Sequence, residues 1–193
     1  MVASYRGSRV GDVEHDITRQ LEDDMNTETA FALAAQPGDT ATVVAELRDR
    51  AEITDALHRF ALGQDLKDGD LFASAFTADA ELDFRPAAAR WGGKPPVMSG
   101  RDTIVSTILA MFTGRVNTTH QVTNVRISID GDTARLTALV EAQHVLIDAP
   151  DTHALLKNPY TVDLVRDGSR WLVRRMRIEN TWLTGDPLAI FGA

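Results

Sequence analysis

The stretch that decides the fold is TTHQVTNVRISIDGDTARLTALVEAQHVLI, residues 118–147. Apolar and polar residues alternate on both sides of Asp130-Gly131-Asp132. A period of two is typical of a half-buried strand, and a short glycine-containing turn between two such runs indicates a β-hairpin. The sequence therefore predicts antiparallel strands over 118–129 and 133–147.

The alternation also predicts which side chains of this hairpin face inward. Pairing across the turn places His120 opposite residues near 142–144, so the His120 and His144 imidazoles are expected to be neighbours. His120 and Val125 fall on opposite parities, which a β-bulge in 118–129 would reconcile. Between 133 and 147 the predicted inward set is apolar except for one histidine: Ala134, Leu136, Ala138, Val140, Ala142, His144 and Leu146.

Outside the hairpin, helical periodicity comes first and further strands follow. Upstream we expect a helix from Thr40 to about Gln64, a short helix at 71–76, a strand at 81–84, a loop at 86–99, and a helix from a Ser99/Asp102 capping box to Met111 or Phe112. Downstream, strands are expected at 160–166 and 171–182. Helices followed by a run of strands indicate an α+β fold, with a curved antiparallel sheet closing over the helices.

Composition sets the class of protein. The chain has 193 residues, 44% of them apolar and 25% charged, and it has no cysteine. Disulfides, thiolate zinc sites and cysteine nucleophiles are therefore excluded. Residues 1–40 hold three basic and eight acidic residues and are interpreted as an acidic N-terminal extension, with one domain at 41–193.

The charge pattern and the apolar runs limit the partners. The net charge is −8, and no basic face suited to a nucleic-acid backbone is visible. No apolar run is long enough to span a membrane, and the first residues lack the apolar core of a secretory signal. We therefore expect a cytoplasmic protein without nucleic-acid or membrane partners, acting on a small molecule.

Two histidines and one aspartate are the candidates for chemistry. His120 and His144 lie on predicted inward positions, and a neutral imidazole titrates in the right range for moving protons at neutral pH. Asp65 lies at the end of the first helix, where the helix dipole disfavours a carboxylate unless it has a partner. One reading is an Asp65–imidazole pair that orients a base, and the other is a turn residue in DLKDGD.

A metal or cofactor is not expected. Two histidines and a carboxylate can hold iron, but the usual second ligand, two residues after the first histidine, is Val122 here. Dinucleotide-binding, P-loop and serine-hydrolase motifs are absent from the sequence. His15 in the extension, His58 on the first helix and His153 in a loop are assigned to solvated positions.

Four stretches together resemble the SnoaL-like branch of the nuclear-transport-factor-2 superfamily. They are DRAEITDALHRFALGQDLKDGDLFASAFTADAELDF at 49–84, GRDTI at 100–104, TTHQVTNVRISIDGDTARL at 118–136 and YTVDLVRDGSRWLV at 160–173. The resemblance spans about 43–187 and implies a cone-shaped α+β fold, with helices packed in a curved antiparallel sheet around one deep apolar pocket. This fold hosts many different activities, so the fold alone does not give the function.

The resemblance also implies a set of site residues. Scytalone dehydratase and hexachlorocyclohexane dehydrochlorinase in this superfamily use an Asp–His dyad that matches Asp65 and His120. A second pocket histidine of the dehydratase falls at or near His144. The resemblance therefore implies Asp65, His120 and His144 as catalytic residues.

Several family positions differ in this chain. The tyrosine and aspartate of the ketosteroid isomerases are Phe60 and Phe84 here. The two dehydratase tyrosines that hold a water fall on Gln64 and Phe84, and the lysine and arginine of the dehydrochlorinase fall on Phe60 and near Met176. These differences argue against steroid isomerisation, halide elimination and scytalone itself as the reaction or substrate.

We therefore expect a cofactor-independent, dehydratase-like lyase or isomerase for an apolar ring-containing molecule of the polyketide, steroid or terpenoid class. Asp65 would hold His120, His120 would take a proton, and His144 would protonate or position the departing oxygen. Candidate substrate-binding residues are Phe60, Phe84, Asn124, Tyr160, Asn180 and Trp182.

Two alternatives remain open at this point. One is a small-molecule binding protein without chemistry. The other is an interaction protein like the β subunit of ring-hydroxylating dioxygenases, which shares the fold. A homo-oligomer, either a dimer or a trimer, is expected, with an outward row of Arg175, Arg177 and Glu179 as its candidate interface.

Overall fold

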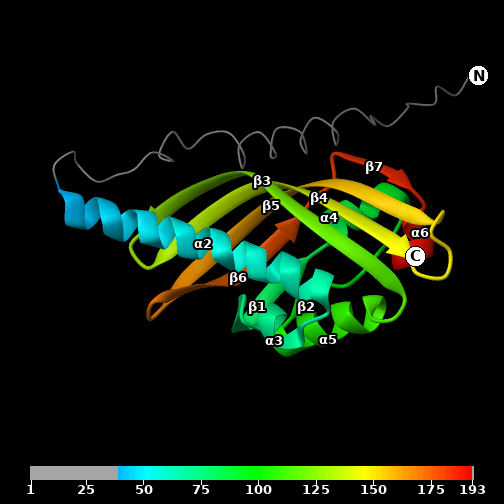
Figure 1. Cartoon of the computed structure of the whole chain (residues 1–193), viewed down its shortest axis with the longest axis horizontal. Helices are drawn as coiled ribbons and strands as arrows, with labels where there is room; N and C mark the ends of the chain where they lie inside the picture. The colour runs from blue at the N-terminus through cyan, green and yellow to red at the C-terminus, as the bar shows by residue number, and fades with distance from the viewer. Residues whose placement is uncertain (1–38, 193) are drawn as a thin grey trace, which may run out of the picture. The chain divides into compact units, whose positions relative to one another are not determined.

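The computed structural model describes residues 39–192, in which helices pack against a curved, seven-stranded sheet (Figure 1). The strand order is β2-β1-β6-β5-β4-β3, and β7 pairs with β5. In chain order the elements are α2 (Thr40–Leu66), α3 (Gly69–Ala73), β1 (Phe76–Asp83), α4 (Arg85–Ala88), η2 (Ala89–Trp91), β2 (Met98–Ser99), α5 (Arg101–Phe112), β3 (Val116–Asp130), β4 (Thr133–Leu146), β5 (His153–Asp167), β6 (Arg170–Ile178), β7 (Trp182–Gly185) and α6 (Pro187–Phe191). The α+β class is confirmed. Apart from Asp39 and Thr40, the extension expected at 1–40, with its His15, lies outside the described residues.

The central hairpin has the predicted register. His120 pairs with Ala142 and Thr118 pairs with His144, so the two histidines lie on neighbouring strands. The register shifts between Thr123 and Arg126, which confirms the β-bulge. The inward row of β4 is buried from Ala134 to His144, and Leu146 at its end is half-buried.

One strand pair corrects the expectation of an antiparallel sheet. β1 and β6 run parallel, with Glu81 opposite Arg175, while the other strand pairs among the described residues are antiparallel. The chain passes from β1 to β6 through α4, η2, β2, α5 and the strands β3, β4 and β5, and not through a hairpin. A crossover of this kind is what a parallel pair requires, because a tight hairpin can join only antiparallel strands.

Some element boundaries differ from those predicted. β5 begins at His153, seven residues earlier than expected, and Pro159 lies where its partner changes from β7 to β6. The predicted strand at 171–182 divides into β6 and β7, and the predicted loop at 86–99 contains α4, η2 and β2. Gly100, and not the Ser99 capping box, precedes α5, and no side chain caps that helix.

The outward row predicted at Arg175, Arg177 and Glu179 puts the even-numbered residues of β6 inward, and this parity is wrong at the start of the strand. Trp171 and Val173 point inward and Leu172 is half-buried, because the β5–β6 register shifts after Asp163. Beyond this irregularity Met176 and Ile178 are buried as predicted.

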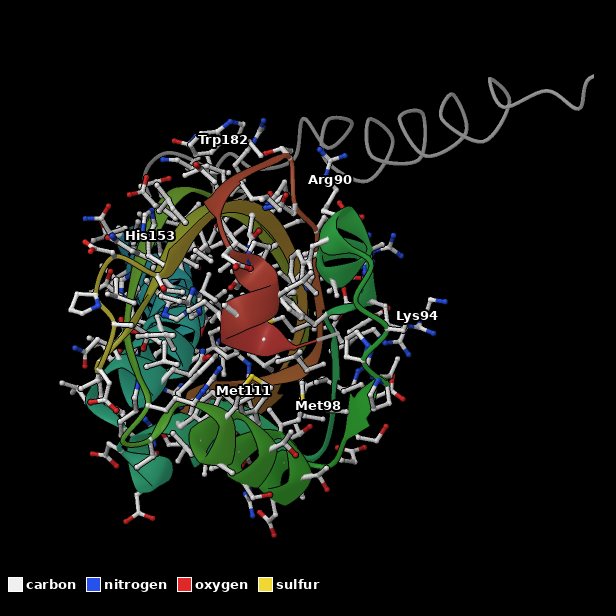
Figure 2. All side chains as sticks on the ribbon, turned by 90° about the vertical axis from the view of Figure 1, so that its right-hand side faces the viewer. Arg90, Lys94, Met98, Met111, His153 and Trp182 are labelled. Atoms are coloured by element: carbon white, nitrogen blue, oxygen red, sulfur yellow. The ribbon has the colours of Figure 1, made fainter. Side chains whose placement is uncertain are left out.

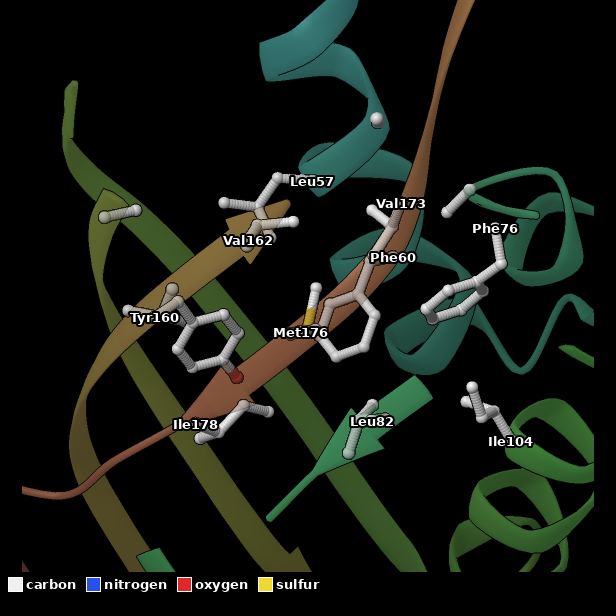
Figure 3. Close-up of a cluster of buried hydrophobic side chains, with 14 of the residues drawn as sticks. Leu57, Phe60, Phe76, Leu82, Ile104, Tyr160, Val162, Val173, Met176 and Ile178 are labelled. Atoms are coloured by element: carbon white, nitrogen blue, oxygen red, sulfur yellow. The ribbon is translucent and has the colours of Figure 1, made fainter. Parts of the chain in front are cut away.

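The core lies between α2 and the inner face of the sheet (Figure 3). Phe60 of α2 makes edge-to-face contacts with Phe72, Phe76 and Tyr160 at ring-centroid distances of 5.5, 5.9 and 6.0 Å. This packing fixes the last two turns of α2 against the sheet, which is where the site residues begin. None of the helices between residues 39 and 192 combines the length and the apolarity that crossing a bilayer demands.

Candidate active site

The last turn of α2 brings Asp65 against the first half of β3. Asp65 Oδ1 lies 2.7 Å from Nδ1 of His120, and Oδ2 accepts a hydrogen bond from the His120 backbone N–H at 2.8 Å. The Thr118 hydroxyl donates to Oδ1 at 2.9 Å. The His120 side chain is only 4% exposed. The structure therefore places the two predicted partners in direct contact.

The environment of Asp65 fixes its charge and the tautomer of His120. Burial tends to raise the pKa of the Asp65 carboxyl, but the hydrogen bonds and charge of His120, together with Thr118, outweigh it, so this pKa lies below its usual value. An ionised carboxylate accepts hydrogen bonds and cannot donate one. The proton of neutral His120 therefore lies on Nδ1, and Nε2 carries a free lone pair.

Lys67 and Thr118 extend this hydrogen-bonded group, and neither was among the predicted site residues. Lys67 follows α2 with a φ of 59°, and its Nζ donates to Gln64 O at 2.8 Å and to Thr118 Oγ1 at 2.9 Å. Because Thr118 accepts from the ammonium, its own hydroxyl proton is directed to Asp65. The shared parity of residues 118 and 120 was a signal for Thr118, whereas the placement of Lys67 depends on its left-handed backbone.

His144 is the second histidine of the site. Its ring lies 5.6 Å from the His120 ring, centroid to centroid, at nearly a right angle. Phe112 and Phe191 pack against it at 5.3 and 4.8 Å. Burial, followed by the charges of His120 and Lys67, lowers the pKa of His144 well below its usual value. His144 is therefore neutral at pH 7.

Both histidines face an apolar cavity of about 220 Å³. Its wall comes from α2, β1, the α4–η2 segment, α5, the strands β3–β6 and α6. Gln64, Asn158 and Tyr160 are its other buried polar side chains. Nonpolar walls with a few polar groups are typical of small-molecule sites.

Three of the six predicted substrate-binding residues line this cavity, namely Phe60, Phe84 and Tyr160. Asn180 is buried but does not reach it. Its Nδ2 donates to Asn158 Oδ1 at 2.9 Å, so Asn180 supports Asn158, which lines the cavity instead.

The other two expected pocket residues lie outside the cavity. Asn124 is exposed because the bulge in β3 places it on the outer side of the strand with a φ of 53°. Trp182 is 50% exposed because the chain leaves β6 after Ile178 and begins the separate strand β7. Figure 2 shows Trp182 at the periphery of the molecule.

The C-terminal helix α6 forms part of the cavity wall and was not predicted from the sequence. Phe191 stacks on Trp91 at 5.4 Å, and Arg115 donates to the carbonyls of Ala189 and Ile190 at the end of the helix. Figure 2 shows α6 between α4 and α5. The available signal was Asp186-Pro187, a helix cap followed by proline at the first helical position.

The remaining polar candidates lie elsewhere. His58 is exposed on α2, and His153 is half-buried at the start of β5. Arg175 pairs with Glu81, and Arg177 pairs with Glu179, on the outer side of the sheet. In residues 39–192 no three His, Asp or Glu side chains are grouped so that they could hold a metal ion.

Comparison with known proteins agrees with this fold. The SnoaL-like domain family matches residues 45–177, and the chain belongs to this family. Terrestric acid biosynthesis cluster protein E of Penicillium crustosum is 31% identical over 165 residues, which are 82% of this chain and 99% of that protein.

Solved structures extend the likeness to the fold. The Kfla4162 protein from Kribbella flavida superposes with a TM-score of 0.64 and 27% identity, over 72% of this chain and 95% of its own. A putative scytalone dehydratase from Novosphingobium aromaticivorans gives a TM-score of 0.62 over 74% and 92% of the two chains. At 19% identity this last likeness concerns the fold alone.

Proposed function

We propose that the protein is a cofactor-independent lyase or isomerase of the dehydratase type, acting on a ring-containing small molecule. The observation that carries the proposal is the Asp65–His120 pair beside the apolar cavity that His120 lines. A carboxylate that binds one imidazole nitrogen leaves the other nitrogen free to act as a base. A related protein named for a biosynthesis cluster adds support, because such clusters make small molecules.

Nε2 of His120 would remove a proton from a carbon next to a carbonyl group. The developing imidazolium is stabilised by Asp65, which lies 2.7 Å from Nδ1. The electron pair of the broken C–H bond forms the new double bond between the α- and β-carbons, and the C–O bond at the β-carbon breaks with its electrons leaving on the oxygen. The proton on His120 passes to the departing oxygen, so that water leaves and the base is restored.

His144 has a different role from His120 in this reaction. The sequence analysis expected it to protonate or to position the departing oxygen, and its low pKa favours positioning. A neutral imidazole about 5.6 Å from the His120 ring can hydrogen-bond an oxygen held between the two rings. His144 would therefore orient the leaving group and would not act as an imidazolium acid.

Tyr160 and Asn158 are the candidates for holding the substrate carbonyl. Both line the cavity from β5. They could replace the family's two water-holding tyrosines, whose positions are Gln64 on α2 and Phe84 after β1 in this chain. Burial raises the pKa of Tyr160, so its hydroxyl stays protonated and can donate a hydrogen bond.

The test begins with the ligand. Native mass spectrometry of the purified protein identifies any co-purified organic molecule, and β-hydroxy ring ketones of the same class are then screened for loss of water. General acid–base catalysis contributes about 10²- to 10⁴-fold, so His120→Ala is expected to lower turnover by at least about 10²-fold. His58→Ala, on the exposed face of α2, is the matched control.

The outcome separates the two kinds of function. Turnover by His120→Ala within about threefold of the unmodified protein would disprove the acid–base role. A ligand that binds and is recovered unchanged would favour the non-catalytic binding protein instead.

A further inference from the structure

His120, His144 and Tyr160 are the only ionisable side chains among the described residues that line the cavity. No Asp, Glu, Lys or Arg side chain of the described residues lines it. Two charged groups lie close to the cavity, the Asp65 carboxylate of the dyad and the Lys67 ammonium, and both already have hydrogen-bond partners. Asp65 accepts hydrogen bonds from His120 and Thr118, and Lys67 donates to Thr118 and Gln64. A charged ligand would therefore find no counter-ion on this wall.

The polar and aromatic parts of the wall come from different elements. His120, His144, Asn158 and Tyr160 lie on the consecutive strands β3, β4 and β5. The aromatic group consists of Phe84, Trp91 and Phe191, whose ring centroids lie 5.4 to 5.7 Å from one another. These three come from the end of β1, from η2 and from α6. A ligand that satisfies both parts carries oxygen atoms at one edge and a flat apolar body at the other.

A cavity wall without charged side chains favours the binding of uncharged ligands over charged ones. Moving an ion from water into an apolar cavity without a counter-ion costs far more than moving a neutral amide or hydroxyl that finds a hydrogen bond. His144 does not supply the missing positive charge for an anion, because burial and its cationic neighbours keep it neutral. A protonated His120 already faces the Asp65 carboxylate.

We propose that this pocket selects uncharged, oxygen-bearing aromatic or polycyclic molecules and excludes carboxylates, phosphates and ammonium ions. The oxygenated edge lies against the histidines, Asn158 and Tyr160, and the ring system lies on Phe84, Trp91 and Phe191. This inference rests on the proposed function in taking the cavity as the substrate site.

Three bicyclic probes of nearly equal shape test the selectivity. Isothermal titration calorimetry at pH 7 measures the affinity of the full chain for 2-naphthamide, 2-naphthoate and 2-naphthylmethylammonium. The amide is expected to bind about tenfold or more tightly than either ion, because only the ions lose uncompensated hydration. Binding of either ion within about threefold of the amide overturns the proposal, and so does failure of the amide to bind.

A charge introduced into the wall provides a second test. Met111 lines the cavity from α5 and is half-buried, so Met111→Lys can place an ammonium there on a flexible stem. The variant is expected to improve the affinity for 2-naphthoate relative to 2-naphthamide by about tenfold. Ala110→Lys, exposed on the same helix, is the control and should leave the ratio unchanged. An unchanged ratio in a folded Met111→Lys protein contradicts the proposal.

These measurements are independent of turnover. If His120→Ala left turnover intact, the proposed function would fail while the binding order of the probes could still hold. If the ions bound as well as the amide while turnover still required His120, only the inference of an uncharged substrate would fail.

Discussion

Asp65 holds His120 at two points, by Oδ1 on the ring Nδ1 at 2.7 Å and by Oδ2 on the backbone N–H at 2.8 Å. The backbone contact fixes where β3 passes the end of α2, and the ring contact fixes the tautomer. One carboxylate therefore controls both the position of the base and its protonation pattern. The helix dipole alone would disfavour this carboxylate, and the two donors of His120 offset that cost.

Replacing the carboxylate by its amide tests this relationship. Asp65→Asn keeps the shape but removes the charge that stabilises an imidazolium, so kcat/KM on an identified substrate is expected to fall by about 10²-fold or more. Circular dichroism checks that the variant is folded, and Asp102→Asn, 93% exposed on its side chain, is the control. A loss no larger in Asp65→Asn than in Asp102→Asn would contradict the role.

Thr118 and Lys67 act on the dyad through hydrogen bonds. Thr118→Val removes the donor to Asp65 Oδ1, and we expect kcat to fall by about tenfold with little change in KM. Thr118→Ser keeps the hydroxyl and should restore most of the activity. Steady-state kinetics of the three proteins measures this, and equal activity of the valine and serine variants would exclude a role for the hydroxyl.

Acid should destabilise the fold through His144. The pKa of His144 is lowered in the folded chain and returns to about 6.5 on unfolding. Between these two values the unfolded chain binds more protons, so the free energy of unfolding falls with decreasing pH, by at most about 1.4 kcal/mol per pH unit. Urea denaturation between about pH 7 and pH 5 measures this slope.

His144→Phe keeps a ring beside Phe112 and Phe191 and should flatten the slope in that range. Asp65 affects the free energy of unfolding in a separate, more acidic pH range. Its folded pKa is lowered, so its contribution is present above about pH 3.9 and is lost as the pH falls through the folded value. A slope between pH 7 and pH 5 that is equal in both proteins would argue against a neutral His144.

Gly63 marks a close contact between α2 and α3. A Cβ at this position would lie 2.5 Å from the Phe72 backbone, which is too close for any side chain. Alanine usually stabilises a helix, but Gly63→Ala should reduce the free energy of unfolding by about 1–3 kcal/mol. Gly69→Ala is the control, because its Cβ would meet Leu109 at an ordinary 3.5 Å. Equal midpoints of chemical denaturation for the two variants would show that the contact is not tight.

Arg115 should matter for the cavity although it does not line it. Its guanidinium binds the Ala189 and Ile190 carbonyls at 2.6 and 2.7 Å and so holds α6 beside the cavity. Arg115→Met is expected to weaken 2-naphthamide binding by about threefold to tenfold, because Phe191 loses its fixed position. Arg170→Met, exposed at the start of β6, is the control for titration calorimetry. Unchanged affinity would mean that packing of Phe191 alone positions α6.

The sequence by itself determined the features that depend on local periodicity. The turn at 130–132 and the alternation around it fixed the β3–β4 hairpin, the inward side of His144 and the closeness of His144 to His120. The stripe from Thr40 onward predicted α2, and the apolar residues of that stripe are buried from Ile53 on, whereas Val44 and Leu47 near the start of the helix are exposed. Local patterns are sufficient here because one buried face per element sets both the period and the register.

Only the tertiary structure decided which distant segments complete the cavity. Asn124 and Trp182 share strand parities with inner residues, yet the bulge in β3 turns Asn124 outward and the end of β6 at Ile178 turns Trp182 outward. Lys67, Arg115 and α6 enter the site through contacts between residues far apart in the chain, or through a left-handed backbone, which no periodicity encodes. Local pattern fixes the face of an element, but long-range packing fixes what that face meets.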